Sequence, residues 1–100
     1  MKVYLRKSSN PKKKYMVNFV KNGRDVTVHF GQKGASDFTR HKDPERKERY
    51  IARHKVREVW TKNGMIRPAF WSRWLLWNKS TLYKSIEDVN KRFGLNIIRN

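Results

Sequence analysis

Residues 13–30 read KKYMVNFVKNGRDVTVHF, two segments of alternating polarity on either side of Asn22-Gly23. Both residues of that dipeptide tolerate the positive φ of a two-residue type I′ turn, which makes it a strong signal for a β-hairpin. A loop formed by these two residues predicts three cross-strand pairs on one face: Phe19 with Val26, Val17 with Val28, and Tyr15 with Phe30. The opposite face then carries Asn18, Thr27 and His29. This register separates apolar from polar side chains and therefore decides how the N-terminal part of the chain folds.

We expect the hairpin to belong to an antiparallel β-meander over about residues 2–31. Val3 to Arg6 can form its first strand. The connection from Ser8 to Lys14 is polar and charged, so we expect an exposed, mobile loop there. From Gly31 to Lys42 we expect irregular structure, because Gly31 and Gly34 interrupt any regular pattern.

The first long helix is predicted over about residues 44–60. Asp43 is a favourable N-cap, Pro44 suits the first helical position, and Glu45 complements the helix dipole. Asn63-Gly64 is expected to end this helical region.

Two further helices are predicted over about residues 68–77 and 81–93. Pro68 can begin the first, which holds most of the tryptophans, and Ser80 can cap the second. Gly94 is the expected C-terminal stop, and residues 95–98 can dock on the core or add an edge strand. The fold class is therefore α+β, with residues 1–100 as a single basic domain.

Composition indicates the kind of partner. The chain has 25 Lys and Arg against 8 Asp and Glu, a formal charge of +17. Its 37% hydrophobic residues are too many for a disordered polycation, so the chain should fold. Self-repulsion at this charge disfavours a compact state, and an anionic partner would relieve it. Nucleic acid, an anionic membrane surface and an acidic protein are the candidates.

No cysteine is present, and no apolar run is long enough for a membrane span. The first residues, MKVYLR, lack the apolar core of a signal peptide. We therefore expect a protein that stays inside the cell or is packaged in a particle.

The charge concentrates on the predicted helix 44–60. Four arginines recur every three or four residues and would share one face: Arg46, Arg49, Arg53 and Arg57. We call this set the arginine ladder. Neighbours at that spacing lie about 5–6 Å apart on a helix, comparable with successive phosphates of a nucleic-acid strand. Arginine can also bind a phosphate through two hydrogen bonds. The plainer interpretation is a solvated helix face, which a Glu45–Arg49 pair would favour.

Other basic residues are weaker candidates for phosphate contacts. The run Lys12-Lys13-Lys14 is expected to act as an auxiliary arm, and Arg40 and Lys42 lie close to the ladder in the sequence. Trp71, Trp74 and Trp77 could stack nucleobases, but their spacing of three residues favours packing on the apolar face of the sheet.

No catalytic motif is present. Asp37, His41, Asp43 and His54 form the one set that resembles a metal or acid–base site. Asp43 is better explained as a helix cap and His54 as a hydrogen-bonded structural histidine. We therefore predict that the protein is not an enzyme and holds neither a metal nor a cofactor.

A string of motifs resembles small basic proteins of nucleocytoplasmic large DNA viruses. The motifs are GASDFT at 34–39, HKD at 41–43, RKxRYIxRH at 46–54, ExW at 58–60, FWSRW at 70–74 and LWNK at 76–79. The resemblance covers roughly residues 28–94 and departs at Pro68-Ala69-Phe70, where an Ala-Gly pair is expected before the aromatic residue. It implies a viral protein in the virion, or in the host nucleus or cytoplasm during infection, without an established catalytic activity.

Together these observations predict sequence-nonspecific binding of nucleic acid, with duplex DNA favoured, for compaction or packaging of viral DNA. The alternative is a minor structural protein that contacts capsid proteins through its aromatic residues. A membrane surface ranks last, because the predicted helix 44–60 lacks a bulky apolar face.

Overall fold

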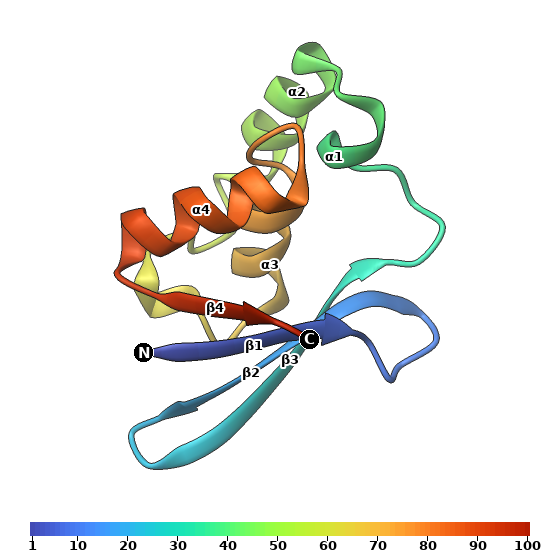
Figure 1. The fold of residues 1–100 in the computed structure, drawn as a ribbon. Coiled ribbons are helices and arrows are strands. Elements are labelled where there is room, and N and C mark those ends of the chain that lie inside the picture. Colours follow the sequence, from blue (N-terminus) through green and yellow to red (C-terminus); the bar gives the residue numbers. More distant parts are fainter.

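The computed structural model describes residues 1–100 as an α+β fold with one four-stranded sheet and helices on one of its faces (Figure 1). Along the chain the elements are β1 (Lys2–Lys7), β2 (Lys13–Lys21), β3 (Arg24–Gln32), α1 (Phe38–His41), α2 (Pro44–His54), the 3₁₀ turn η1 (Lys62–Gly64), α3 (Pro68–Trp71), the π-helical turn η2 (Ser72–Leu76), α4 (Leu82–Phe93) and β4 (Asn96–Arg99).

The sheet has the order β3-β2-β1-β4. The first three strands form the predicted antiparallel meander, and β4 returns from α4 to pair in parallel with β1. Residues 96–99 therefore add the edge strand that the apolar C-terminal segment indicated. The strand β1 becomes a central strand, which explains why Val3 and Leu5 are fully buried.

The predicted hairpin register is confirmed. Tyr15 faces Phe30, Val17 faces Val28, and Phe19 faces Val26. Asn22 and Gly23 both adopt positive φ, 53° and 76°, as a type I′ turn requires. The turn and the alternating pattern on both sides of it agree on one register over two nine-residue strands.

The core lies between the apolar face of the sheet and the segment α3–η2, with α4 closing one side. Trp71 is fully buried against Phe19, with 6.0 Å between the ring centroids. Its indole nitrogen donates a hydrogen bond to the Met65 carbonyl over 2.7 Å, so the one polar atom of this side chain is satisfied inside the core.

The predicted helix 68–77 is a single helical segment that widens in its second half. The backbone N–H of Trp77 donates to the carbonyl of Ser72, five residues earlier. This wider turn rotates the residues after Ser72, and it buries both Leu75 and Leu76.

The predicted helix 44–60 was too long. Helix α2 ends at His54, and residues 55–57 form turns. Beyond His54 the apolar side chains find no partner surface, since Val56 and Val59 are 76% and 49% exposed. Without apolar burial, the last turn and a half gains too little to stay helical.

Three smaller expectations were also wrong. Lys13 and Lys14 belong to strand β2 rather than to a mobile loop, because strand pairing with β3 extends to Lys13 and Gln32. The segment 31–42 is not wholly irregular, since it contains the end of β3 and helix α1.

Thr81, not Ser80, caps α4, because its hydroxyl accepts a hydrogen bond from the N–H of Lys84. Gly94 ends α4 with a φ of 65°, as predicted.

None of the helices combines the length and the apolar character needed to cross a membrane.

Gly64 provides a test of the packing around η1. It is buried, and a Cβ atom there would collide with the carbonyl oxygen of Val59. We expect Gly64→Ala to lower the free energy of unfolding by about 1–3 kcal/mol, because backbone must move to make room. Asn63→Ala, at an exposed neighbour, should change it by less than about 0.5 kcal/mol. Urea unfolding followed by tryptophan fluorescence measures both, and equal effects would contradict this packing.

Candidate nucleic-acid interface

Helix α2 begins as its sequence indicates. The carboxylate of Asp43 accepts a hydrogen bond from the N–H of Glu45 over 3.0 Å, and Pro44 occupies the first turn. The N–H of Asp43 in turn donates to Nδ1 of His41 over 3.0 Å. The end of α1 therefore orients the cap of α2, and the two short helices act as one unit.

An aromatic stack holds α2 on the rest of the protein. Tyr50 is the one buried residue of α2, and its ring lies between those of His54 and Trp77. The Tyr50 and Trp77 rings are nearly parallel, at 3°, with centroids 4.3 Å apart. Burial raises the pKa of the Tyr50 hydroxyl, and the nearby charge of Glu58 raises it further. This residue therefore remains neutral at physiological pH.

A chain of hydrogen bonds anchors the segment that follows α2. His54 Nδ1 and a carboxylate oxygen of Glu58 are 2.7 Å apart, and the other oxygen accepts from the Trp60 indole over 2.9 Å. The Trp60 carbonyl then accepts from the Trp74 indole over 2.8 Å. His54 therefore has the structural role that its position predicted.

All four residues of the arginine ladder are exposed. Arg46, Arg49 and Arg53 lie on α2, spanning about 10 Å at 1.5 Å per residue. Arg57 lies in the turn after the helix, where its N–H donates to the His54 carbonyl. Only Arg49 has a carboxylate partner, at 3.9 Å from the exposed Glu45. A contact of that length between exposed groups contributes little, so the ladder keeps its charge available.

The predicted lysine arm divides into three different environments. Lys12 is exposed, whereas Lys13 is half-buried within β2. Lys14 bridges to the loop before α1, with its Nζ 2.5 Å from an Asp37 carboxylate oxygen and from the Ala35 carbonyl. The structure therefore brings only Lys12 of this run into solvent as a free cation.

The other two basic candidates also differ. Lys42 ends α1 in the left-handed conformation, and its ammonium group donates to the carbonyls of Thr39 and Ser80 over 2.8 and 3.0 Å. It therefore ties α1 to the start of α4. Arg40 is exposed and lines a hollow at the end of the sheet together with Lys33 and Thr39, whereas no residue of the ladder lines that hollow.

The four residues that resembled an acid–base site have separate structural roles. Asp37 caps α1 and pairs with Lys14. Asp43 caps α2, and its backbone N–H donates a hydrogen bond to His41. His54 pairs with Glu58. No three histidine or carboxylate side chains in the protein come together as a metal ion would require.

The tryptophan faces are covered. Trp71 is buried, Trp77 stacks on Tyr50, and the guanidinium groups of Arg73 and Arg92 lie 4.4 and 4.5 Å from the centre of the Trp74 ring. The aromatic segment is therefore part of the core, as its spacing favoured, and does not present free rings to a partner.

A second group of cations was not anticipated. Lys47, Arg73, Lys79 and Arg92 gather around one carboxylate, Asp88. Desolvation lowers the pKa of Lys47, and the charges of Arg73 and Lys79 lower it further. Burial alone would raise the pKa of Asp88, but hydrogen bonds from Asn78 and Arg92 and the nearby positive charge outweigh it and lower the pKa. Lys47 lies on α2, Arg73 on η2, Lys79 in the segment between η2 and α4, and Asp88 and Arg92 on α4, so no short sequence pattern reveals the group.

The environment of His41 predicts a dependence of stability on pH. Desolvation lowers its pKa below 6.5, and the charge of Arg46 lowers it further, against smaller effects of Asp43 and Asp37. Nδ1 accepts from Asp43, so Nε2 carries the proton, and this atom is buried without a partner. The unfolded chain therefore binds a proton more readily, and stability should decrease as the pH falls through 6.5.

His41→Asn keeps an acceptor near the Nδ1 position and removes the titration. We expect the wild-type protein to lose more thermal stability between pH 7.5 and pH 5.5 than this variant does. His29 and His54 remain in both proteins, so the difference between the two melting curves isolates His41. Parallel pH profiles would show that His41 is not desolvated.

Comparison with known proteins adds one relationship. No curated protein and no solved structure matches the chain significantly. Residues 3–54 match a family described as a family of unknown function (DUF5754). The matched segment runs from β1 to the last residue of α2 and so includes the meander and three residues of the arginine ladder. Since it covers more than half of the chain, the protein belongs to this family of unknown function, DUF5754.

Proposed function

We propose that this protein binds nucleic acid without sequence specificity, with duplex DNA as its main ligand, through the arginine ladder. The observation that carries the proposal is the exposure of four arginines at helical spacing, three of them without a carboxylate partner. Phosphate contacts of this kind supply most of the affinity of nonspecific binders and do not depend on the bases.

The way α2 is held supports the same function. Tyr50 faces inward and stacks on Trp77, which directs the ladder toward solvent. The cap at Asp43 and the anchor at Glu58 hold the helix at both ends. Pre-positioned arginines lose less conformational entropy when they bind phosphates than arginines on a disordered tail. A folded scaffold therefore gives the ladder an advantage over a simple polycation.

We further propose viral DNA as the natural ligand, compacted or packaged in a virion. This part is supported by the motifs at residues 34–79 that resemble proteins of large DNA viruses. We then expect the protein in purified virions of the virus that encodes it, remaining with the genome when the particle is opened. Recovery with the shell after nuclease treatment would instead favour the capsid-associated alternative.

The salt dependence of binding tests the ladder. Each phosphate contact contributes about −0.9 to the slope of log K against log salt on duplex DNA. Replacing all four ladder arginines by glutamine should therefore reduce the magnitude of the slope by about 3–4 and weaken binding at every salt concentration. The measurement is fluorescence anisotropy with a random-sequence duplex at several salt concentrations.

A variant with Lys2, Lys21, Lys84 and Lys91 replaced by glutamine is the matched control. It loses the same charge at positions outside the ladder, on β1, β2 and α4. Its slope should change by less than about 1. If the control and the ladder variant lose equal slope, binding follows net charge and the ladder has no special role.

Replacing the four arginines by lysine separates geometry from charge. Lysine keeps the charge but cannot form two parallel hydrogen bonds to one phosphate. We expect affinity to fall about three- to tenfold while the salt slope stays near the wild-type value. Unchanged affinity would show that the ladder acts only as a set of point charges.

A further inference from the structure

A groove at the open end of the sheet gathers cations, most of which lack counterions. It consists of two adjoining hollows, of about 440 and 380 Å³, which share Lys7 and Tyr15 as lining residues. The first hollow lies on the side of Arg99, and the second on the side of Lys33 and Arg40. We call the pair of hollows the basic groove.

Strand pairing places these residues on the helix side of the sheet. Lys7 faces Tyr15 across β1 and β2, and Leu5 faces Arg99 across β1 and β4. Alternate residues of a strand share a face, so Lys7 lies on the same face as the buried Leu5. At this end of the sheet, the positions that face the helices are thus occupied by Lys7, Tyr15 and Arg99 instead of aliphatic side chains.

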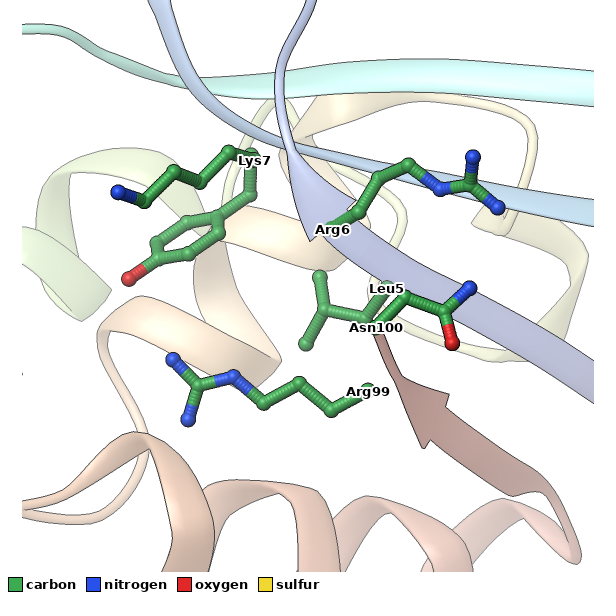
Figure 2. A pocket seen from close by; sticks show the side chains of 6 residues that line it. Leu5, Arg6, Lys7, Arg99 and Asn100 are labelled. Atoms are coloured by element: carbon green, nitrogen blue, oxygen red, sulfur yellow. The ribbon is translucent and has the colours of Figure 1, made fainter.

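Figure 2 shows the first hollow from close by. The side chains of Lys7 and Arg99 extend in the same direction, whereas that of Arg6 extends the opposite way along the strand. Two cationic groups from different strands, β1 and β4, therefore converge on one space.

The charges in the groove are not balanced. Six cationic residues line it, namely Arg6, Lys7, Lys14, Lys33, Arg40 and Arg99, against one acidic side chain, Asp37, although the Arg6 side chain extends away from Lys7 and Arg99 (Figure 2). Asp37 pairs with Lys14, and none of the other five cations takes part in an ion pair. Mutual repulsion of these groups costs free energy in the unliganded protein, and a bound anion would relieve it.

We propose that the basic groove binds two neighbouring phosphate groups, one in each hollow, with Lys7 between them. Arg99 would contact the phosphate in the first hollow, and Lys33 and Arg40 the one in the second. A diphosphate and two successive phosphates of a single nucleic-acid strand both present two linked anionic phosphate groups, at a shorter spacing in the diphosphate. The groove does not include the arginine ladder, so it can bind phosphate whether or not the ladder binds duplex DNA.

Amide chemical shifts of the ¹⁵N-labelled full chain test the proposal directly. The probes are inorganic pyrophosphate and a five-nucleotide oligothymidylate, each titrated at constant ionic strength. We expect saturable shifts at residues 5–7, 15, 33–34, 39–40 and 99 with at least one of the two probes. A response to oligothymidylate that is tighter than to pyrophosphate assigns the site to a strand, and the reverse order assigns it to a free diphosphate.

Variants distinguish a built site from diffuse attraction. The double variant Lys7→Gln, Arg99→Gln should weaken binding about tenfold or more, because both groups contact phosphate. The double variant Lys84→Gln, Lys91→Gln loses the same charge on α4, where neither residue lines a hollow, and should weaken it less than about twofold. Replacing the four ladder arginines by glutamine should leave pyrophosphate binding within about twofold, which separates this site from the proposed function.

Three results would overturn the proposal: no saturable shift with either probe, shifts spread over the whole basic surface, or an equal loss of affinity in the Lys7 and Arg99 variant and in the Lys84 and Lys91 variant. Far-ultraviolet circular dichroism and thermal melting of each variant confirm that the fold is intact. Since Lys7 and Arg99 are both exposed, the variants should fold. If the Lys7 and Arg99 variant did not fold, the double variant Lys33→Gln, Arg40→Gln, which removes the two exposed contacts proposed in the second hollow, should weaken binding in the same titration, and an unchanged affinity would overturn the proposal.

Discussion

The stack of Tyr50 on Trp77 is the contact on which the functional surface depends. It is the main apolar anchor of α2, since no other residue of that helix is buried. Trp77 is held in turn because the π-helical turn directs residues 75–76 into the core. The position of the arginine ladder therefore depends on the tryptophan segment, and the position of that segment depends on its packing against the sheet.

The second constraint is electrostatic. Of 25 lysines and arginines, only three form ion pairs: Lys14, Arg49 and Arg92. Fourteen of the 25 fall into three groups: the ladder on α2 and the turn after it, the group around Asp88, and the basic groove at the end of the sheet. The groove lies at the ends of the strands and shares no cation with the other two groups, and each of the three groups can attract anions.

Local rules were sufficient where a few neighbouring residues determine the backbone. Asn22-Gly23 selected the turn, and the alternation around it determined the register. Asp43-Pro44 determined where α2 begins, because capping involves only the first turn. The end of α2 could not be read in the same way. The helical pattern continues to Trp60, but whether Val56 and Val59 find apolar surface depends on distant segments, and they do not.

The amino-acid sequence alone was enough to predict an α+β domain with a defined hairpin, a capped basic helix and far more positive than negative charge. These features follow from turn chemistry, periodicity and composition, which act over short stretches or over the whole chain. Which cations remain free depends instead on contacts between segments that are distant in the sequence. Lys14 is paired with Asp37 and Lys42 with backbone carbonyls, while Lys7 and Arg99, 92 positions apart, converge on one hollow. Charge is a property of each residue, but its availability depends on which residues the fold brings near it.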